Sequence, residues 1–153
     1  MSVSIRKIEA RDESRWRTLW DGYLRFYKEE LPEDVTRHTW KRLMSVESPV
    51  FGIVAEDSSD GVIGIANYLI HESTWGATPI CYLEDLFVDP ARRAKGVGEQ
   101  LIDWLVAETK SRGWSGLYWH TRETNYRARG LYDKYSPHSG FVRYVAKIQQ
   151  EIS

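Results

Sequence analysis

The spacing of hydrophobic residues in the first third of the chain predicts one strand followed by two helices. Residues 3–8 alternate apolar and polar side chains, as a strand with one buried face does. Asp12 can cap the helix that follows. Large apolar residues then recur every three or four positions, on one side of a helix: Trp16, Leu19, Trp20, Tyr23, Leu24 and Tyr27. Pro32 is expected to end this helix, and a shorter one is expected over residues 33–44.

Three strands are expected in the middle of the chain. Residues 51–56 and 62–70 are apolar runs, and the turn-forming residues 57–61 between them predict a hairpin. Residues 71–79 form a loop that carries Trp75. A third apolar run, residues 81–88, ends at Asp89 and Pro90. The small residues Gly64 and Ala66 in the second strand indicate close contact with another element.

The last third of the chain alternates helices and strands. Residues 99–112 give a well-defined amphipathic helix, and Gly113 is placed to terminate it. A strand over residues 117–121 is followed by a helix from Asn125, its cap, to Tyr135. Residues 141–148 alternate again and predict a final strand. Hairpin strands followed by strand–helix–strand units indicate an α/β fold with a mixed sheet, in a single domain over residues 1–153.

Composition narrows the classes of function. The 153 residues carry a net charge of −1, which favours neither a nucleic acid nor an acidic membrane as partner. No apolar run approaches the roughly 20 residues of a membrane span, and the N-terminus lacks a secretory signal. Cys81 is the one cysteine, so no disulfide can form within the chain. We expect a cytoplasmic protein without a metal site.

Residues 93–98, Arg-Ala-Lys-Gly-Val-Gly, are the most informative stretch. They follow a predicted strand and precede a predicted helix. Backbone N–H groups at a helix N-terminus attract anions, and glycine lets a phosphate approach the chain closely. Arg92, Arg93 and Lys95 add positive charge at the same place. The pattern predicts a pyrophosphate site, although many strand–turn–helix units carry glycines only for tight packing.

Two other phosphate-binding motifs do not fit this stretch. A P-loop needs Lys and Ser or Thr after its last glycine, but Gly98 is followed by Glu99 and Gln100. The dinucleotide fingerprint needs a third glycine and an early position in a repeated strand–helix unit, whereas this turn lies past the middle of the chain.

Arg93, Gly96 and Gly98 resemble the pyrophosphate loop of the GNAT-superfamily N-acetyltransferases, Arg/Gln-x-x-Gly-x-Gly/Ala. A second family motif, an Asn-led helix that ends in Leu-Tyr, is matched by residues 125–132. The resemblance covers the whole chain. It implies a mostly antiparallel sheet of six to seven strands, splayed at the middle and flanked by about four helices. Ala94 departs from the family, which often has glycine there.

The resemblance also implies acetyl-CoA as co-substrate and a set of residues that bind it. Leu86, Phe87 and Val88 would pair their backbone groups with the amides of the pantetheine arm. The remaining cofactor residues are those of the loop, Arg93, Ala94, Lys95, Gly96, Val97, Gly98 and Glu99, and those of the second motif, Asn125, Ala128 and Leu131.

Two side chains are candidates for proton transfer. Tyr132, in the Leu-Tyr pair, would protonate the leaving thiolate, since a phenol with a pKa of about 10 keeps its proton at neutral pH. The alternative is an aromatic packed on a helix. Glu84 would accept the amine's proton, directly or through water, and neighbouring Asp85 and burial would raise its pKa. Alternatively, both carboxylates pair with arginines.

Carboxylates and aromatics that flank the expected acceptor groove suit a cationic amine. The candidate substrate residues are Tyr23, Tyr27, Trp75, Glu84 and Asp85. The resemblance extends to polyamine, D-amino-acid and histone acetyltransferases, and we favour a small amine such as a polyamine or amino acid. A protein lysine or N-terminus is the second hypothesis, and a non-catalytic acyl-CoA-binding module is the third. A homodimer is also expected.

Overall fold

A computed structural model describes residues 2–148, without the side chains of residues 94 and 95. The chain divides into two compact units, residues 1–120 and residues 121–153. The expectation of a single domain over residues 1–153 stays a prediction.

The first unit contains a five-stranded mixed sheet. Its elements are β1 (Val3–Lys7), η1 (Ala10–Asp12), α1 (Glu13–Phe26), α2 (Glu33–Met44), β2 (Val50–Asp57), β3 (Gly61–His71), β4 (Ile80–Val88), η2 (Pro90–Lys95), α3 (Val97–Arg112) and β5 (Leu117–Trp119). The strands lie in the order β1-β2-β3-β4-β5. Strands β1 to β4 pair antiparallel with one another, and β5 runs parallel to β4. The predicted α/β class is confirmed.

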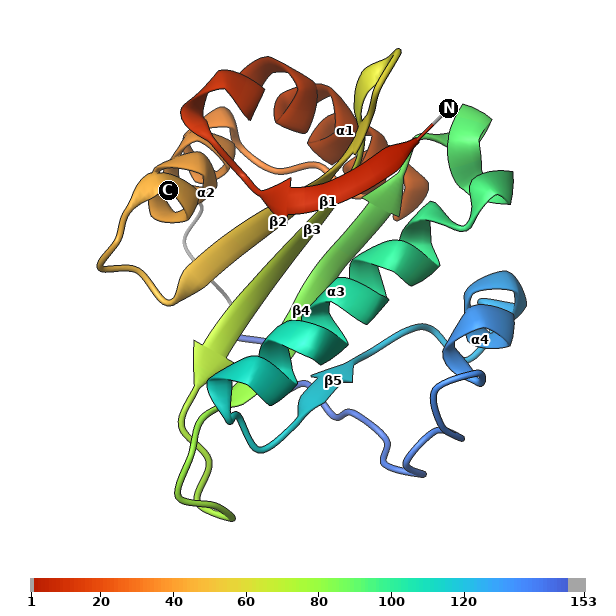
Figure 1. The fold of residues 1–153 in the computed structure, drawn as a ribbon. Coiled ribbons are helices and arrows are strands. Elements are labelled where there is room, and N and C mark those ends of the chain that lie inside the picture. The colour runs from red at the N-terminus through yellow and green to blue at the C-terminus, as the bar shows by residue number, and fades with distance from the viewer. Residues whose placement is uncertain (1, 149–153) are drawn as a thin grey trace. The chain divides into compact units, whose positions relative to one another are not determined.

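Helices cover both faces of this sheet (Figure 1): α1 and α2 lie on one face and α3 on the other. The apolar stripe of α1 buries Trp16, Leu19 and Trp20 against the sheet. On the opposite face, a methyl group on Gly64 would lie 3.3 Å from Val97 Cγ1. The small residue therefore lets α3 pack close to β3, as the sequence predicts. No helix in the described part of the chain is long and apolar enough to span a bilayer.

The strand pairing opens the sheet between β4 and β5. Residues 81–83 of β4 pair with residues 117–119, and β5 ends there. From Asp85 to Val88, β4 therefore pairs with β3 alone among the described residues, and Glu84 pairs with neither strand. This part of β4 keeps an open edge, which agrees with the expected splaying at the middle of the sheet.

Several element boundaries differ from the predicted ones. The first helix ends at Phe26 rather than at Pro32, because Lys28 adopts the left-handed conformation, with φ of 56°. The N–H groups of Lys28 and Glu29 turn back to the carbonyls of Arg25 and Leu24, which closes the helix end. Helix α3 begins at Val97, two residues before the predicted start.

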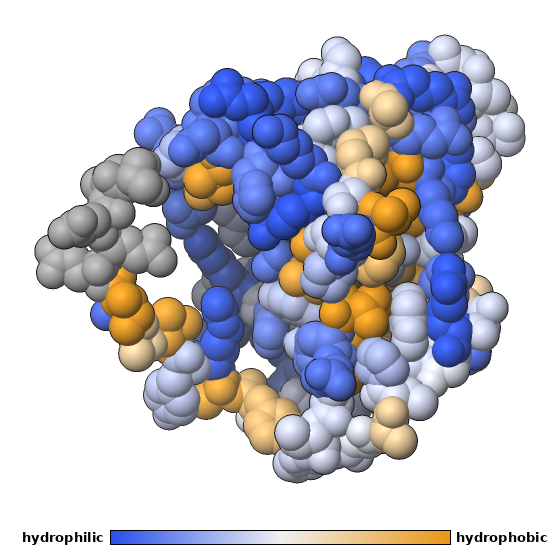
Figure 2. Space-filling model, turned by 90° about the vertical axis from the view of Figure 1, so that its left-hand side faces the viewer, coloured by the Kyte–Doolittle hydropathy of each residue, from blue (hydrophilic) through white to orange (hydrophobic). Residues whose placement is uncertain are grey.

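The predicted final strand over residues 141–148 is wrong for the described part of the chain, where these residues form no strand. Their apolar side chains are exposed, with exposed fractions of 86% for Phe141 and 91% for Tyr144. Figure 2 shows that hydrophobic residues also reach the surface elsewhere, among hydrophilic ones, on the face that it presents. Alternation selects residues that suit a sheet, but a strand also needs a neighbouring strand for its backbone hydrogen bonds. The described sheet accordingly has five strands, not six to seven.

Candidate active site

A β-bulge in β4 separates the two adjacent carboxylates. Asp85 lies opposite Asn67 of β3, and Leu83 lies opposite Tyr68, so that Glu84 has no partner on β3. Asn67 faces α1, because its side chain bonds to Trp16. Asp85 therefore faces α1 as well, whereas Glu84 is exposed.

A chain of hydrogen bonds that begins at buried Trp16 holds the partly buried Asp85. Trp16 Nε1 donates to Asn67 Oδ1 at 3.3 Å, and Asn67 Nδ2 donates to Asp85 Oδ2 at 3.0 Å. The Tyr23 hydroxyl also bonds to this carboxylate. Burial raises the pKa of Asp85 to about 6, and the bonds from Asn67 and Tyr23 oppose part of that rise. The burial that we expected at Glu84 occurs at Asp85 instead.

Two of the predicted substrate aromatics lie beside these carboxylates. Burial and the negative charge of Asp85 raise the pKa of Tyr23, which keeps its phenol protonated. The rings of Tyr23 and Tyr27 meet edge to face, with centroids 5.0 Å apart. The charge of Glu84 also acts on Tyr23. The structure thus brings Tyr23, Tyr27, Glu84 and Asp85 together where α1 ends over β4.

Trp75 is not brought to this cluster. It lies in the loop between β3 and β4 with 94% of its surface exposed, and its backbone N–H donates to Ser73 Oγ. Its role in substrate binding stays a prediction. Asn67 is not among the predicted site residues, although a single polar residue within the apolar run 62–70 is a signal that a buried partner exists.

The open edge of β4 presents the backbone of alternate residues. The Asp89 N–H donates to Ile63 O of β3 at 2.8 Å, so the backbone groups of Asp89 and Phe87 face β3. Those of Leu86 and Val88 therefore face the open edge. Arg93 Nε reaches this edge and donates to Val88 O at 3.3 Å. The backbone groups of Phe87 face β3, so they are not available at the open edge for the predicted pairing with pantetheine. The Phe87 ring packs in the hydrophobic core.

The predicted pyrophosphate turn consists of η2 and the first turn of α3. Asp89 caps η2 by accepting the Ala91 N–H, and Gly96 links the two helices in the left-handed conformation, with φ of 71°. Gln100 N–H donates to Gly96 O at 3.1 Å. The amides that precede it lie in the first helical turn, where backbone N–H groups have no acceptor within the helix and attract anions. Ala94 and Lys95 supply backbone to η2, and Val97 is buried.

The two arginines of the turn are held by other side chains. Arg92 forms an ion pair with Asp60 of the β2–β3 turn. The Arg93 guanidinium lies over the rings of Phe26 and Phe87, 5.4 and 5.3 Å from their centroids. Arg93 thereby ties the turn to α1 and β4.

In the second unit, Asn125 caps α4 (Tyr126–Tyr132), which confirms the predicted helix start. Its Oδ1 accepts the Ala128 N–H at 3.4 Å, and its Nδ2 donates to Thr121 Oγ1 at 3.2 Å. Leu131 and Tyr132 end the helix and are partly buried. The roles of Tyr132 as acid and of Asn125, Ala128 and Leu131 as cofactor contacts stay predictions.

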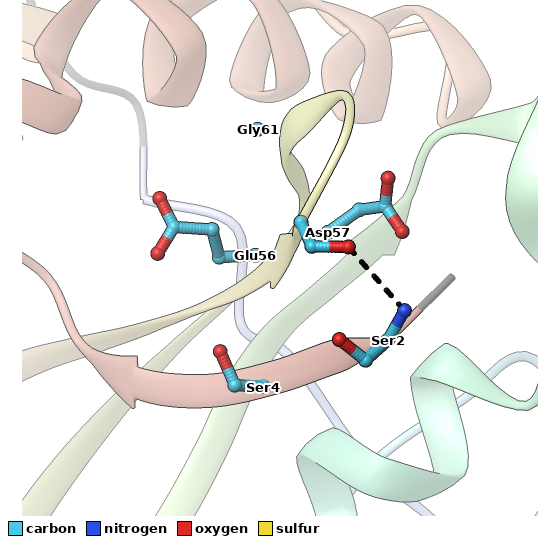
Figure 3. A pocket seen from close by; sticks show the side chains of 6 residues that line it. Ser2, Ser4, Glu56, Asp57 and Gly61 are labelled. Carbon is cyan, nitrogen blue, oxygen red and sulfur yellow. Dashed lines mark hydrogen bonds between the residues drawn. The ribbon is translucent and has the colours of Figure 1, made fainter.

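A hollow lies at the β1 edge of the sheet, away from the predicted site (Figure 3). It is lined by Ser2, which precedes β1, by Ser4 of β1, by Glu56 and Asp57 of β2, and by Ser58 and Gly61 of the following turn. Its two carboxylates have structural partners: Glu56 accepts from Arg6 Nε at 3.0 Å, and Asp57 accepts the N–H groups of the turn. None of the predicted site residues lines this hollow.

Comparison with known proteins identifies the family that this chain resembles. The model of the acetyltransferase (GNAT) family matches residues 14–136. The D-amino-acid N-acetyltransferase HPA3 of Saccharomyces cerevisiae is 35% identical over 133 residues, which cover 86% of this chain and 83% of that protein. The thialysine N-epsilon-acetyltransferase of Bos taurus is 35% identical over 71 residues, 46% of this chain and 41% of that protein.

The fold is also found among solved structures. AAC(6')-Iy, solved with the bisubstrate analogue CoA-S-monomethyl-acetylneamine, superposes with a TM-score of 0.81 at 18% identity. The superposition covers 98% of this chain and all of that one.

Proposed function

The chain belongs to the acetyltransferase (GNAT) family, and from that premise we propose that it transfers an acetyl group from acetyl-CoA to the primary amine of a small molecule. An amino acid or a polyamine is the favoured acceptor. The relatives named for D-amino-acid and thialysine acetylation support this choice.

The observation that carries the proposal is the acidic and aromatic cluster at the β4 bulge. Exposed Glu84 supplies a carboxylate at the surface, and Asp85 supplies a second one that Asn67 holds in place. The rings of Tyr23 and Tyr27 lie beside them. An alkylammonium group is stabilised both by carboxylates and by aromatic faces, so this cluster suits a cationic acceptor.

The residues along β4 and the following turn suit acetyl-CoA. The edge-facing backbone groups of Leu86 and Val88 match the alternating donors and acceptors of the pantetheine amides. Gly96 and the start of α3 supply the amides and the helix dipole that a pyrophosphate requires. When bound, acetyl-CoA supplies a thioester carbonyl and a thiolate leaving group.

The protein residues hold the amine and move its protons. Glu84 and Asp85 hold the ammonium group, and Glu84 accepts a proton from it through water. Loss of this proton frees the nitrogen lone pair for direct attack within a ternary complex. Tyr132 Oη then donates its proton to the departing sulfur. The nitrogen carries an extra proton after the attack, and the loss of this proton gives the neutral amide and restores the phenol.

The test is a thiol-release assay with acetyl-CoA and a panel of acceptors: polyamines, D- and L-amino acids, aminoglycosides and a histone peptide. We expect release with an amino acid or polyamine, and a loss of about 10²-fold or more in kcat/KM for Glu84→Gln. The exposed Glu47→Gln is the matched control and should leave the rate unchanged.

The other outcomes of this panel are equally informative. Release with the histone peptide alone would replace the small amine by a protein lysine as substrate. Acetyl-CoA binding without thiol release for any acceptor would favour a non-catalytic binding module and would contradict the proposal.

A further inference from the structure

Four aromatic side chains outside the predicted site gather on the strands next to Glu84. The rings of Tyr82 and Tyr118 stack across β4 and β5, with centroids 4.9 Å apart. His71, at the end of β3, meets Tyr118 edge to face at 5.8 Å, and His120 meets both tyrosines. Each imidazole hydrogen-bonds to one phenol: His71 Nε2 to Tyr118 at 2.7 Å, and His120 Nδ1 to Tyr82 at 3.3 Å.

The hydrogen bonds of His71 determine which of its nitrogens carries the proton. His71 Nδ1 lies 2.7 Å from the backbone oxygen of Glu72. Because a carbonyl oxygen can only accept, Nδ1 is the donor in the neutral ring, and Nε2 carries the lone pair. Nε2 must then accept the hydrogen bond from the Tyr118 hydroxyl. His71 is therefore poised to take the proton of this phenol.

Tyr118 lies opposite Tyr82 in the β4–β5 pairing, and Glu84 follows Tyr82 by two residues on β4. Burial raises the pKa of Tyr118, and the negative charge of Glu84 raises it further. A lasting phenolate is therefore unfavourable, and Tyr118 can pass a proton on only by receiving another at the same time. His71 is exposed, so a proton that reaches its ring can leave to water.

We propose that Tyr118 and His71 form a proton relay that carries the acceptor's proton from the Glu84 side of the sheet to solvent. This inference rests on the proposed function. The ammonium N–H proton passes to Tyr118 Oη, directly or through water, while the Tyr118 proton passes to His71 Nε2. The amine is left neutral, the phenol is restored, and the imidazolium releases one proton to solvent. No other reactant is required.

The relay provides a stronger base than Glu84 for the proposed mechanism. An ordinary glutamate, with a pKa of about 4.3, is a weak base for an ammonium with a pKa near 10. A neutral imidazole nitrogen is intrinsically a stronger base than a carboxylate oxygen, so it is the better proton acceptor of the two. In this refinement of the proposed mechanism, Glu84 attracts the cation, and the relay takes the proton in place of Glu84.

The discriminating variant is His71→Gln. A glutamine carbonyl oxygen can accept the Tyr118 hydroxyl hydrogen bond but cannot take up the proton, so the link between β3 and β5 is kept while the relay is lost. We expect kcat/KM for the amine to fall about 10- to 100-fold at pH 7, in the lower range of general acid–base catalysis. The loss should shrink steadily as pH rises toward 10, where about half of the free amine is already neutral. A merely structural role would lower the rate equally at both pH values.

His120→Gln is the matched control, since His120 contacts the same two rings through a longer bond. It should keep the wild-type pH profile. A pH-independent loss in His71→Gln, or the same pH-dependent loss in both variants, would overturn the assignment to His71 and Tyr118. Recovery of His71→Ala activity on addition of free imidazole would support it.

A second measurement does not depend on activity. Long-range ¹H–¹⁵N NMR of the imidazole rings should show the Nδ1–H tautomer for His71, and Tyr118→Phe should shift its Nε2 resonance. The Nε2–H tautomer would overturn the relay even in an active enzyme. Absence of acetyl transfer together with the expected tautomer would instead count against the proposed function.

Discussion

At the scale of single residues, two neighbouring carboxylates have different environments because of one extra residue in a strand. The sequence places Glu84 and Asp85 side by side, and Glu84 is the predicted base, with a pKa raised by Asp85 and by burial. The bulge opposite Asn67 turns Asp85 toward α1 and leaves Glu84 exposed. The sequence identifies the residue types, but the bulge depends on how β4 pairs with β3. That pairing cannot be predicted from the local sequence pattern of β4.

Asp85 makes the stability of the protein depend on pH. Its pKa is higher in the folded chain than in the unfolded one, so the folded state binds the proton more tightly, and stability falls as pH rises from about 4 to about 6. Asp85→Asn removes this dependence. We expect the free energy of unfolding of the wild type, relative to Asp85→Asn, to fall by about 1–3 kcal/mol between pH 4 and pH 7.

Urea denaturation at several pH values measures this difference. The exposed Asp133→Asn serves as control and should follow the wild type at each pH. A constant difference between the wild type and Asp85→Asn across this range would show that Asp85 has an ordinary pKa.

Tyr132 is expected to act as the general acid. Tyr132→Phe removes only the hydroxyl, so we expect turnover to fall by about 10²–10⁴-fold while acetyl-CoA affinity stays nearly constant. Steady-state kinetics and isothermal titration give the two quantities. Turnover at the wild-type level would eliminate the acid role.

At the scale of elements, the hydrophobic pattern predicts the strands and helices of the first unit because each buries one face or one stripe against the sheet. The pattern misplaces the end of α1, since the left-handed turn at Lys28 carries no glycine or proline to mark it. It also predicts a strand over residues 141–148, where alternation is present but the described chain shows no strand. Periodicity indicates which side chains are suited to burial. It does not indicate whether a neighbouring strand is present to pair with.

The turn into α3 gives a prediction at this scale. Gly98→Val places a branched side chain in the first helical turn, where a phosphate would approach the backbone. Valine is a better helix former than glycine, so the fold should persist. We expect the dissociation constant for coenzyme A to rise at least about tenfold, which corresponds to about 1.4 kcal/mol.

Isothermal titration measures this affinity directly. Ser111→Val, at the exposed far end of the same helix, is the control and should bind as the wild type does. Unchanged affinity in Gly98→Val would mean that the pyrophosphate lies elsewhere.

At the scale of the whole molecule, both family motifs are recognisable in the sequence, and each forms the turn or helix start that it predicts. The turn after β4 leads into α3, and Asn125 caps α4. The two motifs lie in different compact units. A local motif fixes its own backbone, whereas the meeting of two motifs around one ligand depends on packing across the molecule.

A homodimer is the expected assembly. Phe141, Tyr144 and Ile148 expose 86%, 91% and 76% of their surface, and exposed apolar residues of this kind favour association. We expect light scattering after size exclusion to give twice the mass of the chain, and Tyr144→Arg to lower it. A monomer at all concentrations would contradict this expectation.

The most direct test of the account is a crystal structure of the protein with coenzyme A. We expect the pyrophosphate on the amides of residues 96–98, the pantetheine amides paired with Leu86 and Val88, and the sulfur within reach of Tyr132 Oη. Coenzyme bound away from β4, or a tyrosine hydroxyl remote from the sulfur, would contradict the proposed site.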